Sequence, residues 1–159
     1  MYYTAAPVCQ RADRRYGQTF WYLFRMAKPV PIGTRAEVER RVETINTLQR
    51  YHPELPPVLS TPEMISLMEW ACFVAQQPYC EADEITVGVR VCVDHLAATG
   101  LGMLVKAEAV MEKMDGKFYV FRVRAWDEQH EIGRGEVHRA VINVERFLKR
   151  VEGKKPSAE

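Results

Sequence analysis

The stretch Thr61-Pro-Glu-Met-Ile-Ser-Leu-Met-Glu-Trp-Ala-Cys-Phe-Val-Ala75 has the composition of a helix that lies inside a protein. Ser60 or Thr61 can cap such a helix, Glu63 adds a carboxylate near the positive end of the helix dipole, and Pro78 ends it. The body is apolar on almost every side, and a helix without a polar face is a buried helix. The pattern therefore predicts a buried helix over about 62–77, with the rest of the chain wrapped around it.

The residues after this helix are mostly of strand type. Apolar and polar side chains alternate in 85–95, which predicts that the apolar ones share one face of a strand, namely Ile85, Val87, Val89, Val91 and Val93. Further strands are predicted at 103–114, 117–127 and about 132–144, with a hairpin turn at Asp115-Gly116, a weaker strand within 34–47 and a short helix over 145–151. One central helix and about five antiparallel strands predict an α+β fold, in which the sheet curls around the helix as in hot-dog proteins.

The chain of 159 residues is long enough for one domain, and its parts differ in character. Residues 1–31 are rich in arginine and aromatic side chains and end in a proline-rich connector. They predict an N-terminal extension, which could serve as a lid, as an arm on a partner subunit or as a poorly ordered tail. Residues 32–151 predict the folded domain, with a proline-stiffened loop over 48–60, and 152–159 predict a polar tail.

Composition and charge argue against several classes of function. A net charge of +1 provides no overall field for nucleic acid, and no segment is long and apolar enough to cross a membrane. The cysteines are Cys9, Cys72, Cys80 and Cys92, and none belongs to a C-x-x-C pair, so no metal site is predicted. Scattered single cysteines are typical of a reducing compartment, which predicts a cytoplasmic protein.

Glu69 is the candidate catalytic residue that the sequence marks most clearly. It is the only charged residue between Met64 and Ala75, and an unpaired carboxylate in an apolar setting costs several kcal/mol. A general base or a nucleophilic carboxylate uses such a setting to tune its pKa. The alternative is a structural carboxylate that bonds to the backbone or to an arginine, or one that reaches the edge of the sheet.

His95 and Thr61 are two further candidates. His95 has the parity of Val91 and Val93, so it is predicted on the helix side of its strand, as a catalytic group or as an ordinary core histidine. Thr61 either caps the helix or, with the backbone N–H groups of the helix start, holds a developing oxyanion.

Four segments carry a resemblance to a known family. They read Thr61-Pro-Glu-Met-Ile-Ser-Leu-Met-Glu-Trp-Ala-Cys72, Val87-Gly-Val-Arg-Val-Cys-Val-Asp-His-Leu-Ala-Ala-Thr99, Glu131-Ile-Gly-Arg-Gly135 and Arg139-Ala-Val-Ile142. Together they resemble the fluoroacetyl-CoA thioesterase family, over about 32–151. In that family, threonine, glutamate and histidine recur at the same separations of 8 and 26 residues.

The resemblance implies a homodimeric hot-dog thioesterase that hydrolyses a short acyl-CoA, with no cofactor apart from the CoA of the substrate. The residues that match the family's functional positions are Thr61, Glu69 and His95 as the catalytic set, and Gly88, Arg139 and Leu55 as substrate contacts. Glu69 would act either as the nucleophile or as the general base that activates water.

Two departures from the family pattern limit what the resemblance implies. The fluoroacetyl-CoA enzyme carries phenylalanines in a lid over the acyl pocket, where this chain has His52 and Leu55, so a preference for the fluoroacetyl group is not implied. The family's Gly-Thr-His-Glu-Arg is Gly135-Glu-Val-His-Arg139 here, so no role is implied for His138. Two other functions stay open: a hot-dog protein that binds an acyl-CoA or a small metabolite without turnover, and a hot-dog dehydratase that acts on a carrier-bound acyl chain.

Overall fold

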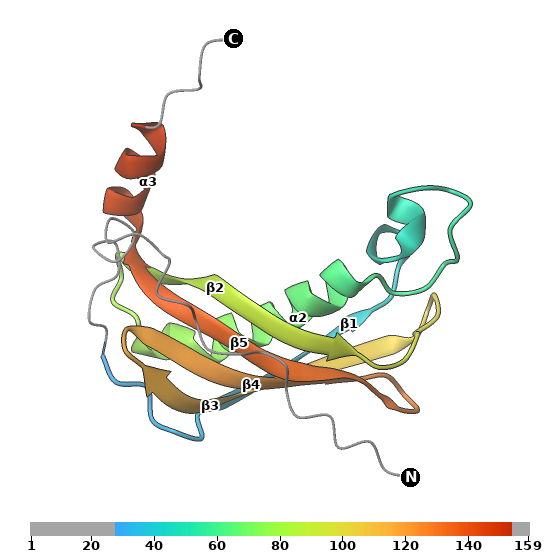
Figure 1. Cartoon of the computed structure of the whole chain (residues 1–159), viewed down its shortest axis with the longest axis horizontal. Coiled ribbons are helices and arrows are strands. Elements are labelled where there is room, and N and C mark those ends of the chain that lie inside the picture. Colours follow the sequence, from blue (N-terminus) through green and yellow to red (C-terminus); the bar gives the residue numbers. More distant parts are fainter. Residues whose placement is uncertain (1–27, 154–159) are drawn as a thin grey trace.

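The computed structural model describes residues 28–153, in which a five-stranded antiparallel sheet curls around one long helix (Figure 1). The strands are β1 (Arg35–Arg41), β2 (Glu84–His95), β3 (Leu104–Asp115), β4 (Phe118–Trp126) and β5 (Glu131–Asn143). The helices are α2 (Thr61–Gln76) and α3 (Val144–Glu152), with three short 3₁₀ turns, η1 (Thr44–Asn46), η2 (Leu48–Arg50) and η3 (Gln77–Tyr79). The sheet order is β1-β3-β4-β5-β2, which confirms the predicted α+β hot-dog layout.

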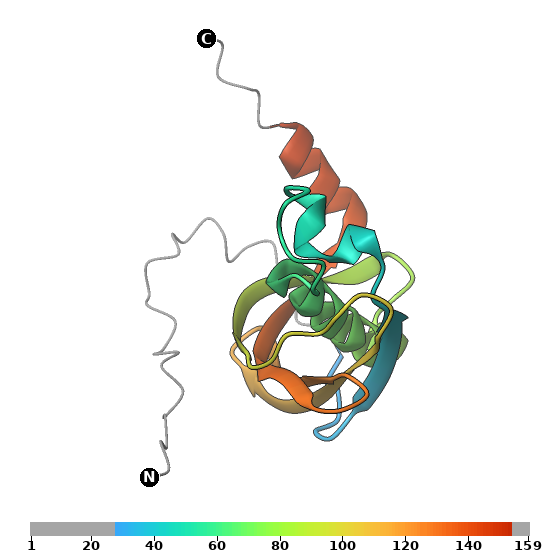
Figure 2. The ribbon, with the colours of Figure 1, turned by 90° about the vertical axis from the view of Figure 1, so that its right-hand side faces the viewer.

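The central helix α2 is buried on one side only. Met64, Met68 and Cys72 are fully covered by the sheet, as the apolar pattern predicts. Trp70, however, is 52% exposed, and its ring stacks on that of Phe73 at a centroid distance of 4.9 Å. The predicted wrapping of the sheet around the helix is therefore confirmed (Figure 2), but the helix is not buried on every side, because Trp70 lies on a face that the strands leave uncovered.

A β-bulge divides the predicted apolar face of β2. Gly88 pairs with Arg139 of β5, but the next paired residue is Arg90, opposite His138, so the register shifts by one residue at Val89. Because a shift of one residue turns later side chains to the other face, Ile85, Val87 and Val89 pack in a small cluster away from α2, while Val93 packs against the main core. The prediction of a single apolar face from Ile85 to Val93 is therefore wrong.

One glycine allows β5 to lie close to α2. A Cβ atom on Gly133 would lie 2.5 Å from the sulfur of Met64, which is itself fully buried. Gly133 pairs with His95 at the end of β2, so this close approach lies beside the candidate histidine.

The connection between β1 and α2, residues 42–60, folds back on itself rather than extending into solvent. Thr47 forms a β-bridge with Leu59, and Val58 forms one with Gly100. The Ser60 amide donates to the Asn46 carbonyl at 2.9 Å, just before α2 begins. We refer to these residues as the 42–60 segment.

The ends of the chain are described only in part. Of the predicted connector before the domain, Val30 is buried, and the Lys28 carbonyl accepts a hydrogen bond from the Tyr119 hydroxyl at 3.1 Å. Most of the predicted N-terminal extension and of the polar tail lies outside the described residues. Between residues 28 and 153, no helix is long and apolar enough to cross a membrane.

Candidate functional site

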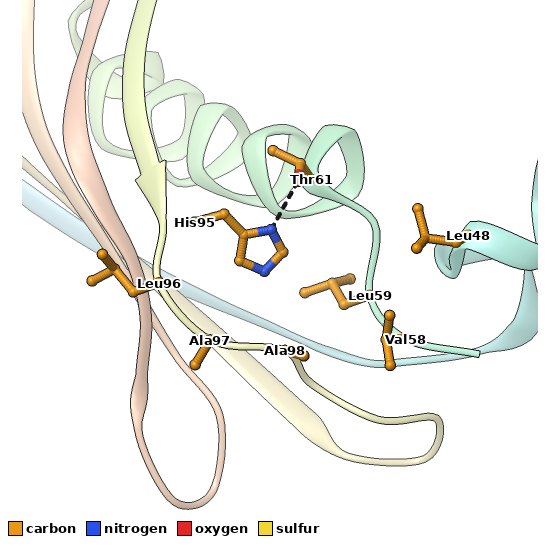
Figure 3. Close-up of a pocket in the computed structure, with 8 residues that line it drawn as sticks. All are labelled: Leu48, Val58, Leu59, Thr61, His95, Leu96, Ala97 and Ala98. Carbon is orange, nitrogen blue, oxygen red and sulfur yellow. Dashed lines mark hydrogen bonds between the residues drawn. The ribbon is translucent and has the colours of Figure 1, made fainter. Parts of the chain in front are cut away.

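Thr61 and His95 meet where the start of α2 faces the end of β2. Thr61 is the first residue of α2, and His95 is the last residue of β2. The Thr61 Oγ1 and the His95 Nδ1 are 2.8 Å apart, so a hydrogen bond joins the two side chains (Figure 3). The other ring nitrogen, Nε2, is buried and makes no hydrogen bond within residues 28–153, so its hydrogen-bonding capacity is not used there.

This pair forms part of the wall of an otherwise apolar pocket of about 390 Å³. The remaining lining residues are Leu48, Val58 and Leu59 from the 42–60 segment, and Leu96, Ala97 and Ala98 from the turn after β2 (Figure 3). Ligand pockets are commonly apolar, with a few polar groups placed to orient the ligand. Here those polar groups are one hydroxyl and one imidazole.

Glu69 lies apart from the Thr61–His95 pair in the chain. Eight residues of α-helix separate it from Thr61, which corresponds to about 12 Å along the helix axis. The Glu69 Oε1 accepts a hydrogen bond from the Arg139 Nη1 at 3.3 Å, so the carboxylate is paired with an arginine. Its side chain is 33% exposed. Within one chain, the structure therefore brings together two of the three predicted catalytic residues.

Gly88 gives the Glu69 carboxylate its space. A Cβ atom on Gly88 would lie 1.9 Å from the Glu69 Oε1, closer than any two such atoms can approach. Gly88 pairs with Arg139 across the β2–β5 ladder, so the glycine, the arginine and the glutamate form one local cluster. The sequence named all three residues, but it did not indicate that they contact one another.

Arg139 is buried and crosses from the sheet to the helix. Its Nε donates to the Thr86 Oγ1 at 3.0 Å, and its Nη2 donates to the Thr86 carbonyl at 2.8 Å. Burial lowers the pKa of Arg139, while the nearby Cys72 and Glu69 act in the opposite direction. An arginine stays protonated even so, and its fixed donors orient the Glu69 carboxylate.

Cys72 lies near the same cluster but is not a candidate nucleophile. Burial is the main cause that raises the pKa of its thiol to about 12, with Arg139 opposing this shift and Glu69 adding to it. Since the thiolate is the nucleophilic form, a thiol with this pKa is inert at neutral pH.

Two groups of residues differ from the sequence-based picture. The structure places Leu55 in an exposed part of the 42–60 segment, outside the lining of the pocket. Sequence reasoning did not identify Thr86 as a site residue, because the pairing of β2 with β5 that brings it near Arg139 cannot be read from the alternating pattern. It also did not name Leu48, Val58 or Leu59, whose positions depend on the folding of the 42–60 segment. In the described part of the chain, no group of three or more His, Cys, Asp or Glu side chains is arranged to hold a metal ion.

Comparison with known proteins identifies the family. Residues 42–145 match the family described as fluoroacetyl-CoA-specific thioesterase. A fluoroacetyl-CoA thioesterase from Streptantibioticus cattleyicolor is 37% identical over 132 residues, which cover 79% of this chain and 95% of that protein. The chain belongs to the fluoroacetyl-CoA-specific thioesterase family.

Solved structures agree with this family and with the fold. The structure of a fluoroacetyl-CoA thioesterase matches with a TM-score of 0.76 and 36% identity, over 81% of this chain and 100% of that one. A thioesterase superfamily member from Thermus thermophilus matches with a TM-score of 0.70 and 29% identity, over 80% of this chain and 99% of that one. A hot-dog-like protein from Thermanaerovibrio acidaminovorans, at 23% identity, a TM-score of 0.72 and coverage of 80% and 95%, supports the fold alone. The comparisons therefore confirm both predictions for this chain, the hot-dog fold and the thioesterase family.

Proposed function

We propose that this family member hydrolyses the thioester bond of a small acyl-CoA. The observation that carries the proposal is the hydrogen-bonded pair of Thr61 and His95 in the wall of an apolar pocket. The lining can hold an acyl chain, while the hydroxyl and the imidazole are the only polar side chains in it. The reaction requires no cofactor in this proposal, because CoA enters as part of the substrate.

In this proposal, one side chain acts on the carbonyl oxygen, a second on the leaving thiolate and a third on the carbonyl carbon. Thr61, at the positive end of α2, holds the carbonyl oxygen as negative charge develops on it. His95 delivers a proton to the departing sulfur through Nε2, whose position leaves it without another partner in the described chain. Glu69 either activates the water that attacks the carbonyl carbon, or attacks it directly to form an acyl-Glu69 anhydride that water then hydrolyses. On both routes the bond from carbon to sulfur breaks. The products are the carboxylic acid and free CoA.

The separation of Glu69 from the pair leads us to include a homodimer in the proposal. At about 12 Å along the helix, Glu69 cannot act on a carbonyl held by Thr61 of the same chain. Large apolar side chains are exposed on the two elements that carry Glu69 and Gly88, namely Trp70 and Val74 on α2 and Val91 on β2. A second copy that covers this surface with two-fold symmetry would place its own Glu69 near the first copy's Thr61 and His95.

The proposal also includes a location in the cytoplasm. Cys72, Cys80 and Cys92 are free thiols, and Cys72 is fully buried. Free cysteines of this kind are usual in proteins of a reducing compartment.

Release of free CoA from a panel of acyl-CoA esters tests the proposed activity. The panel runs from acetyl through longer aliphatic groups to benzoyl and includes fluoroacetyl. We expect turnover of at least one ester by the wild type. Thr61→Val, which keeps the side-chain shape but loses the hydroxyl, and Glu69→Gln should each lower kcat by about 10²-fold or more.

The outcomes separate the proposal from its two alternatives. Tight binding of acyl-CoA without release of CoA would indicate a binding protein. Loss of water from a 3-hydroxyacyl thioester, without hydrolysis, would indicate a dehydratase. A folded Thr61→Val variant with wild-type turnover would remove Thr61 from the mechanism.

A further inference from the structure

Three of the apolar residues in the pocket wall come from a segment that contains no strand or α-helix of its own. Leu48, Val58 and Leu59 belong to the 42–60 segment, which immediately precedes Thr61. Its base is held by backbone pairing, since Thr47 bridges to Leu59. Between these two positions the segment has only the short turn η2 and a run of exposed residues. The wall residues also make backbone hydrogen bonds, since the Leu48 amide donates to the Val58 carbonyl at 3.0 Å and the Leu59 amide donates to the Thr99 carbonyl at 2.8 Å. Side-chain contacts add to this pairing in fixing the wall relative to Thr61.

Those contacts converge on one carboxylate, that of Glu63. Its Oε1 accepts from the Arg50 Nη1 at 2.8 Å. Its Oε2 accepts from the Arg40 Nη1 and from the Asn46 Nδ2, both at 3.0 Å. The Glu63 side chain is only 13% exposed, so these contacts are partly shielded from water. One glutamate in the first turn of α2 thus joins β1, η1 and η2.

The geometry points to Glu63 as a positioning residue, which holds the 42–60 segment in place as the wall of the acyl pocket and so determines how well the acyl group binds. This inference rests on the proposed thioesterase function. Glu63 lies two residues after Thr61 on the same helical turn, and Arg50 lies two residues after Leu48. The ion pair between Glu63 and Arg50 therefore joins the first turn of α2, which carries Thr61, to the turn that carries Leu48.

Capping of the helix alone does not explain this arrangement. A glutamate at this position is favoured by the helix dipole without any arginine partner. Here two arginines and an amide from three separate elements meet the carboxylate, and the Asn46 side chain among them is buried. A helix start does not need these three partners, whereas a carboxylate that holds the 42–60 segment in place does.

The expected effect is moderate, because the pairs are partly exposed. Arg40 and Arg50 are 39% and 47% exposed in their side chains. A partly exposed ion pair of this kind shifts an equilibrium between a held and a released segment by up to about fivefold. Loss of both pairs should therefore raise KM by about three- to tenfold, with kcat within about twofold of the wild type, because Glu63 touches no reacting atom.

The kinetic test uses an uncharged substrate, an acyl N-acetylcysteamine thioester, so that salt cannot act through the phosphates of CoA. We compare Glu63→Gln with Glu112→Gln, whose carboxylate pairs with Arg122 at 2.9 Å between β3 and β4 and not at the pocket. We expect KM to rise in Glu63→Gln and to stay at the wild-type value in Glu112→Gln. Raising the salt concentration should increase KM of the wild type toward that of Glu63→Gln and change Glu63→Gln little, since salt screens the pairs.

Hydrogen exchange of the free protein gives a second readout that does not depend on turnover. We expect the amides of residues 44–59 to exchange faster in Glu63→Gln and in Arg50→Gln, while those of β3 and β4 keep their wild-type rates. Unchanged exchange in 44–59, or an unchanged KM in a folded Glu63→Gln protein, would overturn the positioning role. If the wild type hydrolyses no thioester, the proposed function fails. The role of Glu63 is then tested by the affinity for acyl-CoA in place of KM. An equal affinity in the wild type and in Glu63→Gln would overturn that role.

Discussion

At the scale of single residues, the site depends on the absence of a side chain at Gly88 as much as on the presence of the Glu69 carboxylate. The Glu69 Oε1 occupies the space that a side chain on Gly88 would fill, and Arg139 holds the carboxylate there. Gly88 acts through exclusion, because only a residue without Cβ leaves this volume free. The free space beside Gly88 and the guanidinium group of Arg139 thus together fix the position of the Glu69 carboxylate.

Gly88→Ala should therefore impair catalysis more than folding. The added methyl group would displace the flexible end of Glu69, and a misplacement of about 1 Å at a reacting group can cost about 10²-fold in rate. We expect kcat to fall by about that factor, with a thermal midpoint close to that of the wild type. Gly100→Ala is the matched control, since a Cβ at Gly100 meets nothing within 4 Å. Wild-type kcat in Gly88→Ala would show that the position of Glu69 is not critical.

At the scale of elements, Arg139 ties β5 to both β2 and α2. It donates to the Thr86 hydroxyl and carbonyl on β2 and to the Glu69 carboxylate on α2. Removing this buried cation leaves several acceptors without a donor, and an unsatisfied buried group costs about 1–3 kcal/mol.

Arg139→Met, which keeps much of the side-chain volume, should lower the free energy of unfolding by about 2 kcal/mol or more. Urea denaturation of the variant and the wild type measures this difference. Arg122→Met is the control, because Arg122 is exposed and pairs with Glu112 on the sheet surface. Equal stability of Arg139→Met and Arg122→Met would contradict the role given to Arg139.

Some features of these elements could be predicted from the sequence, and others could not. The strands and α2 could be located because their apolar residues repeat at the periods of strand and helix, and Asp115-Gly116 marks the turn between β3 and β4. The bulge at Val89 could not be located, since one extra residue in a strand leaves the alternation of residue types unchanged. The contact between Thr61 and His95 could be expected only from the family resemblance, and the network around Glu63 not at all, because both join residues distant in the sequence.

At the scale of the whole molecule, the proposed mechanism requires the Glu69 carboxylate to act together with the Thr61–His95 pair. The pair belongs to the start of α2, whereas Glu69 lies eight residues further along the helix, where its carboxylate contacts Arg139 and the next residue, Trp70, is exposed on the helix surface. In a two-fold dimer the same surface meets itself, so each copy would lend its Glu69 to the other copy's pair. Sedimentation should therefore give the mass of two chains.

Mixing of inactive variants tests this arrangement directly. If Glu69→Gln and His95→Gln subunits exchange, each mixed dimer has one site with both defects and one intact site. Since random exchange makes about half of the dimers mixed, about a quarter of wild-type activity should return. Thr61→Val mixed with His95→Gln is the control, because these two residues contact each other within one chain, and mixing cannot restore their pair. Recovery in the first mixture and not in the second would assign Glu69 to the opposite subunit, whereas no recovery in a mixture shown to exchange subunits would place the whole reaction within one chain.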